Sequence, residues 1–251
     1  MGYQVSVARG VDKLRALVTG GSSGIGAAIS RQLSEAGASV VAVSRSGNAP
    51  GDEVVGLAAD LSVAEELDSV IEAAVGSLGG LDVLVNNAGR AHWQSFDDFD
   101  RDDFDATMHL NVWAPLRLSQ LARVHLARSE NASIVMIGSV DAVRPSAGAA
   151  LYGSSKAALA ALTVVLAKEL AADDVRVVQV DPGLVDTPLA AGAVEEVTTN
   201  SKAINLVNRV GRPEEVAGLV CYLVSDLGRF ANGTSFRVDG GALAAGLFDA
   251  D

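Results

Sequence analysis

Tyr152 and Lys156 are the residues of this chain whose types and spacing most directly indicate chemistry. They are four residues apart and lead into a long helical pattern, so both side chains would share one face of a helix. An ammonium beside a phenol favours the phenolate, which lowers the tyrosine pKa from about 10 toward the range of a general acid/base. Ser139, at the end of an apolar strand, and Asn111 could add two further polar groups. These four residues are the predicted catalytic set.

A glycine-rich segment, 19–26, joins the first predicted strand to the first predicted helix. Glycines permit a tight turn and a close approach of a pyrophosphate to backbone N–H groups, and the helix N-terminus adds the positive end of a dipole. An ordinary strand-to-helix turn is the alternative, although the position after the first strand favours a cofactor. The predicted contacts are Gly20, Ser22, Ser23, Gly24, Ile25 and Gly26.

The end of the second predicted strand, Ser44-Arg45, bears on which cofactor would bind. If NAD were the ligand, a dinucleotide fold would place an acidic side chain here to hold the adenine ribose. Neither residue is acidic, and Arg45 can pair with a 2′-phosphate. The sequence therefore predicts NADP(H), with NAD(H) less favoured, unless Arg45 is a surface arginine without a ligand.

The elements that must position these residues alternate along almost the whole chain. Apolar, β-branched runs predict strands at 16–19, 39–43, 54–58, 82–85, 134–137, 175–180 and 236–238, and most are continuous, as in strands covered on both faces. Helical patterns begin at Ile25 and cover about 102–128, 154–172 and 214–225. This alternation predicts an α/β fold with a doubly wound parallel sheet of about seven strands and helices on both faces.

One connection is too short for this pattern. Only nine residues, 45–53, separate the second and third predicted strands, whereas a parallel crossover normally needs a dozen or more. Either a loop replaces the helix here, or the third strand is misplaced.

Composition and charge exclude several classes of protein. Hydrophobic residues make up 49% and charged residues 20% of the 251 residues, which excludes a disordered or fibrous chain. Nineteen Lys and Arg against thirty-one Asp and Glu give a net charge of −12, which repels nucleic acids and anionic lipid surfaces. We therefore expect no nucleic-acid partner.

Cysteine usage and hydropathy bear on metal binding and location. Cys221 is the only cysteine, so neither an intramolecular disulfide nor a multi-cysteine zinc site can form, and no metal site is predicted. The longest apolar run, 157–167, is about half of what a bilayer crossing needs. The first residues lack the apolar core of a signal peptide. These observations predict a cytoplasmic protein without a membrane partner.

The combined motifs resemble the short-chain dehydrogenase/reductase family over about residues 12–245. The order and spacing typical of that family are found in the glycine segment, the Asn-Asn-Ala-Gly at 86–89, Asn111, Ser139, Tyr152, Lys156 and Pro182-Gly183. The resemblance implies one Rossmann-type domain spanning 1–251. It also implies a homotetramer, or a homodimer, because in the family the long helices around Asn111 and Lys156 pair between subunits.

The resemblance also implies roles for individual residues. Tyr152 would exchange a proton with the substrate oxygen and Ser139 would position that oxygen. Lys156 would bind the nicotinamide ribose and tune Tyr152, while Asn111 would hold a water in a proton relay. The cofactor would carry the hydride. Further cofactor contacts would be Asp60 and Leu61 beside the adenine, Asn87, Ala88 and Gly89, and, near the nicotinamide, Pro182, Gly183, Val185 and Thr187. Alternatively, Asp60 is a helix N-cap and Asn87 a structural turn residue.

Three departures from the family pattern bear on the substrate. The short loop after Arg45 resembles that of bacterial 3-oxoacyl carrier-protein reductases that use NADPH. Segment 171–174, Ala-Ala-Asp-Asp, is acidic where those reductases tend to carry a basic residue, so an acidic carrier would be repelled. His92 and Trp93 follow the Asn-Asn-Ala-Gly motif beside the predicted substrate mouth, or else are rim residues that pack on loop 190–208.

These observations predict an enzyme that transfers a hydride between NADP(H) and a small ketone or secondary alcohol. The predicted substrate contacts are Ser139, Val140, Asp141, His92, Trp93 and segment 188–209, which is rich in small residues and partly helical. One alternative is a 3-oxoacyl-[acyl-carrier-protein] reductase. Another is a cofactor-binding regulator on the same fold that has lost chemistry, which the intact catalytic set disfavours.

Overall fold

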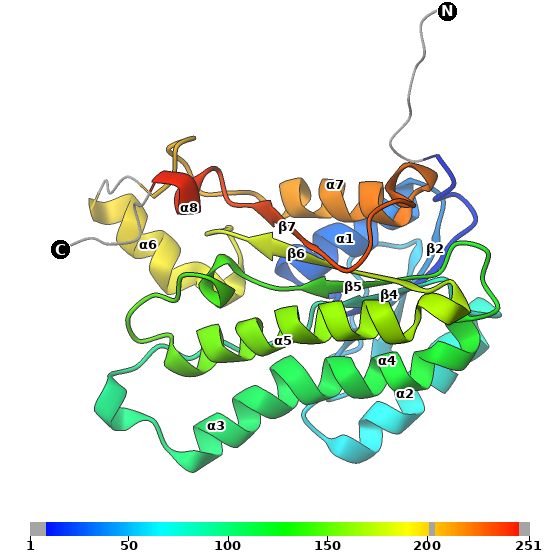
Figure 1. Ribbon diagram of the computed structural model, residues 1–251, viewed down its shortest axis with the longest axis horizontal. Helices are drawn as coiled ribbons and strands as arrows, with labels where there is room; N and C mark the ends of the chain where they lie inside the picture. The colour runs from blue at the N-terminus through cyan, green and yellow to red at the C-terminus, as the bar shows by residue number, and fades with distance from the viewer. Residues whose placement is uncertain (1–8, 201–203, 246–251) are drawn as a thin grey trace, which may run out of the picture.

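Seven parallel strands form one sheet in the order β3-β2-β1-β4-β5-β6-β7 in the computed structural model, which describes residues 9–200 and 204–245 (Figure 1). The strands are β1 (Arg15–Thr19), β2 (Ser39–Ser44), β3 (Val54–Ala58), β4 (Val83–Asn86), β5 (Ser133–Ile137), β6 (Arg176–Pro182) and β7 (Ser235–Val238). The chain order reverses between β1 and β4, as in a doubly wound sheet. The predicted fold class is confirmed, and each predicted strand agrees with an observed one to within two residues.

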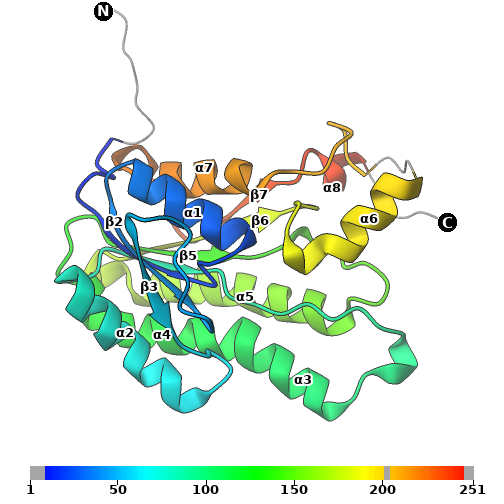
Figure 2. The same ribbon diagram turned by 180° about the vertical axis from the view of Figure 1, so that it is seen from behind.

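Helices cover both faces of the sheet (Figures 1 and 2). One layer holds α1 (Gly24–Glu35) and α7 (Pro213–Val224), and the other holds α2 (Ala64–Leu78), α4 (Ala114–Leu126) and α5 (Ala150–Glu169). Alternate residues of β1 belong to opposite cores, because Ala16 and Val18 pack in the α1/α7 layer and Leu17 in the other. Burial on both sides explains why most strands are continuously apolar.

The short connection from β2 to β3 contains no helix, and the third strand lies where the sequence predicted it. Val40 pairs with Val54, so the two strands are parallel and adjacent. Gly56 has no room for a Cβ because the carbonyl oxygen of Gly47 lies against it, so the loop itself lies on β3 (Figure 2). As an edge strand, β3 leaves Val55 51% exposed and offers little apolar surface for a helix to bury.

The predicted helix over 102–128 is interrupted in the structure. It consists of α3 (Arg101–Met108), a π-helical turn, η2 (His109–Trp113), and α4. The main-chain N–H of Ala114 donates to the carbonyl of His109, five residues earlier instead of four. Turns of this kind occur frequently at functional sites, and Asn111 lies at the centre of this one.

Helix α5 begins four residues earlier than predicted, so Tyr152 lies within its first turn. It is the helix among residues 9–200 and 204–245 that is long and apolar enough to cross a membrane, with 20 residues and a mean hydropathy of 1.5. A core helix of a soluble protein passes the same test, so this is weak evidence. One side of α5 packs on the sheet through Leu159 and Leu166.

Candidate active site

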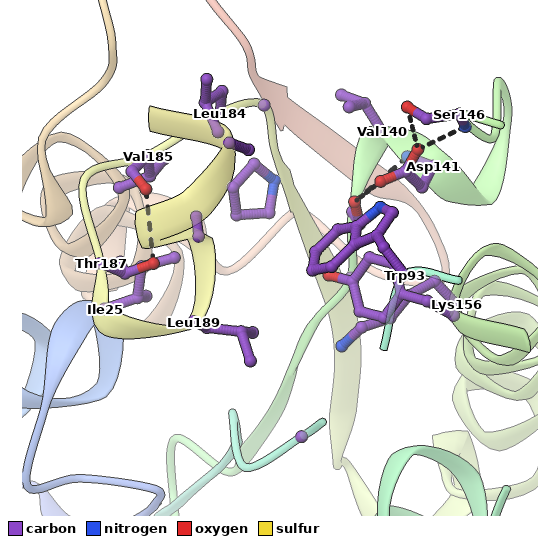
Figure 3. Close-up of a pocket in the computed structure, with 18 of the residues that line it drawn as sticks. Ile25, Trp93, Val140, Asp141, Ser146, Lys156, Leu184, Val185, Thr187 and Leu189 are labelled. Atoms are coloured by element: carbon purple, nitrogen blue, oxygen red, sulfur yellow. Dashed lines mark hydrogen bonds between the residues drawn. The ribbon is translucent and has the colours of Figure 1, made fainter. Parts of the chain in front are cut away.

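A cavity of about 950 Å³ lies at the carboxyl ends of the central strands (Figure 3). One wall comes from the end of β5, the short helix η3 (Val140–Ala142) and α5, and it carries Ser139, Tyr152 and Lys156. The opposite wall comes from Ile25 and from the segment after β6, which includes η5 (Pro188–Ala190) and α6 (Ala191–Asn200). Three of the predicted catalytic residues therefore lie on one wall of the cavity.

Tyr152 lies between an aromatic ring and two polar groups. Its ring lies 5.6 Å from the Trp93 ring and 5.6 Å from Nζ of Lys156, one helical turn away. The Lys156 amine donates a 2.8 Å hydrogen bond to the Ile137 carbonyl at the end of β5. The Ser139 hydroxyl is a hydrogen-bond partner of the Tyr152 phenol. The phenol and the two groups expected to act on it are thus assembled on one wall.

The pKa values of Tyr152 and Lys156 both depart from the ordinary values of these groups. Burial raises the pKa of Tyr152 to about 12, opposed by the Ser139 hydrogen bond and assisted by the negative charges of Asp141 and Asp181. Burial also lowers the pKa of Lys156 to about 8, although Asp181 favours its charged form. The expectation of a lowered Tyr152 pKa is therefore wrong for this structure, because burial disfavours the phenolate more than its neighbours favour it.

Asn111 ties the loop after β4 to helix α5. Its Oδ1 accepts from the Arg90 N–H at 2.8 Å, and its Nδ2 donates to the Arg90 carbonyl and to Ser155 Oγ, both at 2.9 Å. Ser155 Oγ in turn donates to the Tyr152 carbonyl at 2.7 Å. Both amide hydrogens of Asn111 are thus used in positioning. The expected relay water stays a prediction.

The glycine segment forms a cradle between β1 and α1. Gly20 has a φ of +62°, which favours glycine, and a Cβ on Gly26 would collide with the Gly20 carbonyl oxygen. Thr19 Oγ1 accepts hydrogen bonds from the N–H groups of Asn87 and Ala88, at 2.9 and 3.0 Å. The Asn87 amide also donates to the Thr19 carbonyl at 2.8 Å, so Asn87 has the structural role considered as an alternative. The α1 N-terminus and the close backbone packing at these glycines fit a pyrophosphate.

The predicted adenine-side residues lie at the ends of β2 and β3. Ser44 is half-buried and Arg45 is exposed. Hydrogen bonds from Ser62 lower the pKa of Asp60, and the charge of Arg45 contributes. Asp60 is not a helix N-cap, since α2 begins after Val63. Leu61 is buried in the core, and its contact with an adenine ring stays a prediction.

The predicted residues of the nicotinamide side lie around the cavity. Gly89 follows β4, and Pro182, Gly183, Val185 and Thr187 follow one another from the end of β6. Thr187 Oγ1 donates to the Val185 carbonyl at 3.3 Å, and this pair stands opposite the Tyr152 wall (Figure 3). Ser22, Ser23 and Gly24 lie at the start of α1, outside the lining of the cavity.

Among the predicted substrate contacts, Val140, Asp141 and Trp93 line the cavity with Ser139. His92 does not, and the expectation that it would is wrong. Its Nδ1 lies 3.1 Å from Oδ1 of Asp103, a carboxylate of α3 that also accepts from Arg90 at 3.2 Å. The imidazole is therefore directed toward α3, and its side chain is 43% exposed.

Two features of the site went unpredicted. Asp181, buried at the end of β6, accepts from Gln179 Nε2 at 2.7 Å, and burial raises its pKa. The signal in the sequence was a carboxylate directly after the apolar strand run 175–180. Ser146, which bonds the Asp141 carboxylate, lies in a loop without a pattern. Within 9–200 and 204–245, no group of three or more His, Cys, Asp or Glu is arranged to hold a metal ion.

Comparison with known proteins gives similarities over nearly the whole chain. The family model described as Enoyl-(Acyl carrier protein) reductase matches residues 20–242. The chain is 35% identical to the 4-formylbenzenesulfonate dehydrogenase of Comamonas testosteroni, over 92% of this chain and 98% of that protein. A short-chain dehydrogenase from Burkholderia cenocepacia, solved in complex with NADP, is 38% identical, with a TM-score of 0.83 over 92% of this chain and 98% of the other.

A further solved structure is the 3-ketoacyl-(acyl-carrier-protein) reductase of Brucella melitensis, complexed with NADH. It is 29% identical, with a TM-score of 0.85 over 92% of this chain and 99% of the other. The two solved structures thus hold different nicotinamide cofactors on the same fold. From its motifs, its fold and these similarities, the chain belongs to the short-chain dehydrogenase/reductase family of NAD(P)-dependent oxidoreductases.

Proposed function

We propose that this enzyme reversibly reduces a small ketone, or oxidises the corresponding secondary alcohol, with NADP(H) as its cofactor. The observation that carries the proposal is the placement of Ser139, Tyr152 and Lys156 on one wall of a cavity whose opposite wall includes Ile25 of the glycine segment. Reduction adds a hydride to the carbonyl carbon and a proton to its oxygen. The bound cofactor supplies the hydride, and the chain must supply the proton.

Tyr152 would give that proton to the substrate oxygen. Its raised pKa keeps the phenol protonated at neutral pH, which suits the reduction direction. Ser139, a hydrogen-bond partner of the phenol, would hold the same oxygen and orient it. Lys156, with a pKa of about 8, is mostly charged at neutral pH and would bind the cofactor ribose while stabilising the phenolate that forms.

The cofactor would lie across the carboxyl ends of the strands. Residues 20–26 and the N-terminus of α1 would hold its pyrophosphate, and Arg45 the 2′-phosphate. Val185 and Thr187 would hold the nicotinamide end, opposite Tyr152. The relatives named above support a nicotinamide cofactor, and the choice of NADP over NAD rests on Arg45.

A screen of ketones with NADPH and NADH, and of alcohols with the oxidised cofactors, tests this function. Cofactor oxidation or reduction would be followed by absorbance, and products identified by mass spectrometry. We expect turnover of small ketones by the parent enzyme. Failure of every carbonyl and alcohol with both cofactors would contradict the proposal.

A 3-oxoacyl-[acyl-carrier-protein] reductase stays a second candidate. The Brucella melitensis relative favours it, and so does one contact at the acidic segment 171–174. There Arg123 of α4 pairs with Asp173 at 2.6 Å, so the argument that this end would repel an acidic carrier is weaker than the sequence alone suggests. Comparing acyl thioesters with small ketones as substrates separates the two candidates.

We further propose that residues 1–251 form a single catalytic domain with its core at 12–245 and a substrate segment at 188–209. In that proposal the enzyme is a cytoplasmic homotetramer, or homodimer, with neither a nucleic-acid nor a membrane partner. Exposed apolar residues on α4 and α5, such as Val124 and Val165, support association through these helices. Light scattering of the purified protein would test the oligomeric state.

Trp93→Ala should change the substrate profile more than the affinity for NADPH. The indole is 44% exposed, lines the cavity and lies against the Tyr152 ring, so its loss widens the substrate end while the glycine cradle is untouched. The measurement compares kcat/KM over a series of ketones of increasing size with the Kd of NADPH from fluorescence. Equal effects on both would place Trp93 outside the substrate site.

Asp181→Asn should move the pH dependence of alcohol oxidation to lower pH. Oxidation needs the Tyr152 phenolate, so its rate rises with pH up to the pKa of Tyr152, and the charge of Asp181 raises that pKa. The variant removes the charge and keeps an acceptor for Gln179. The measurement is kcat for oxidation as a function of pH. Asp68→Asn on α2 is the control, because it removes the same charge from a residue that does not line the cavity. An unchanged profile would exclude Asp181 from this role.

A further inference from the structure

The substrate end of the cavity holds a carboxylate that the proposed proton transfer does not use. Asp141 lies two residues after Ser139, on the same wall as Trp93 (Figure 3). Its N–H donates to Ser139 Oγ at 3.1 Å, and Ser139 Oγ lies 3.5 Å from Oδ2 of Asp141. The carboxylate is therefore in direct contact with the hydroxyl that would hold the substrate oxygen.

Ser146 fixes this carboxylate in place. Its N–H donates to Oδ1 of Asp141 at 2.9 Å, and its hydroxyl donates to the same oxygen at 3.2 Å (Figure 3). Among the residues that the structure describes, Oδ2 receives the long contact from Ser139. A charged group held in advance loses little freedom when a ligand binds, so Oδ2 is a prepared acceptor beside the reacting carbonyl.

Few charged side chains line the cavity. The charged residues that line the cavity in the described part of the chain are Asp141, Lys156 and Glu196. The Lys156 amine is bonded to the Ile137 carbonyl, and no ion pair joins Asp141 to a lysine or arginine within 9–200 and 204–245. Apolar side chains such as Leu184 and Leu189 make up much of the opposite wall. A carboxylate in such surroundings favours a cationic partner and disfavours an anion.

We propose that Asp141 determines substrate specificity by pairing with a protonated amine of the substrate, so that the preferred substrates are amino ketones and the matching amino alcohols. This inference rests on the proposed function. The contact between Ser139 and Asp141 sets the spacing, because the oxygen held by Ser139 and the amine held by Oδ2 must be close together. The amine therefore lies on the carbon next to the carbonyl or on the one after it.

A matched pair of ketones tests the proposal. The probes are 1-(dimethylamino)propan-2-one and its uncharged isostere 4-methylpentan-2-one, assayed with NADPH at a pH where the amine is protonated. The readout is the ratio of kcat/KM for the charged over the uncharged ketone. This ratio cancels any general loss of activity in a variant. The variants are Asp141→Asn and Ser146→Ala, which removes the hydroxyl bond to the carboxylate and keeps the main-chain one. Asp68→Asn on α2 is the control, because it removes one negative charge away from the cavity.

We expect the parent to prefer the charged ketone by about tenfold or more, because a hydrogen bond to a charged group contributes roughly 1.5–3 kcal/mol and each 1.4 kcal/mol is tenfold. Asp141→Asn should abolish the preference, Ser146→Ala should reduce it, and Asp68→Asn should leave it intact.

A parent ratio near one, or an unchanged ratio in Asp141→Asn, would overturn the proposal. So would failure to reduce the amino ketone while other ketones are reduced. Absence of turnover with every carbonyl would instead contradict the proposed function itself.

Discussion

Tyr152→Phe should lower kcat for ketone reduction by about a hundred- to ten-thousandfold, the usual loss when a general acid is removed. The phenylalanine ring keeps the contacts with Trp93 and Lys156, both 5.6 Å away, but has no proton to transfer. The cofactor should still bind, because the glycine cradle is built from other residues. The measurements are kcat with a ketone from the screen and the Kd of NADPH.

Tyr222→Phe on α7 is the matched control, since it removes the same hydroxyl from a residue that does not line the cavity. It should keep kcat near that of the parent. If Tyr152→Phe retained more than a tenth of the parent kcat, Tyr152 would not be the proton donor.

The second large effect concerns the cofactor: Ser44→Asp should reverse a preference for NADPH over NADH. A carboxylate at the end of β2 would repel a 2′-phosphate and accept hydrogen bonds from the ribose hydroxyls of NADH. In the parent, a contact from Arg45 is worth roughly 1.5–3 kcal/mol, about ten- to a hundred-and-fiftyfold in affinity. Arg45 is exposed and Asp60 is near enough to feel its charge, so the lower half of that range is expected.

Fluorescence titration of both reduced cofactors measures this preference. Arg45→Gln should weaken NADPH alone, and Gln120→Glu, which adds a negative charge at an exposed position of α4, should leave the preference intact. Equal affinities of the parent for NADH and NADPH would show that Arg45 has no cofactor role.

The sheet and its layers could be predicted from sequence because their signals are local. Continuous apolar runs such as that of β5 identify strands buried on both faces. The sequence did not decide whether a loop replaces the helix before β3 or whether that strand is misplaced. The nine residues of this loop connect β2 to β3 at the edge of the sheet without a helix, and the order of strands in the sheet cannot be deduced from any one segment.

The site was predicted by motif, whereas its electrostatics depend on contacts between distant segments. The pKa of Tyr152 is raised by burial and by the charges of Asp141 and Asp181. The periodicity of the sequence does not show that these groups lie near the phenol. His92 follows the motif at 86–89 as Trp93 does, yet Asp103 from α3 binds its ring. Spacing along the chain thus identified which groups could act, and packing decided which of them reach the cavity.

The π-helical turn η2 has a consequence for how chain length can vary in this protein. Successive residues of an α-helix are about 100° apart around its axis, so deleting one residue from His109–Trp113 would join α3 and α4 into an uninterrupted helix and rotate one relative to the other. Asn111 could then no longer reach both Arg90 and Ser155, which its amide now bridges. At this turn the number of residues is therefore as much a determinant of the active site as their identity.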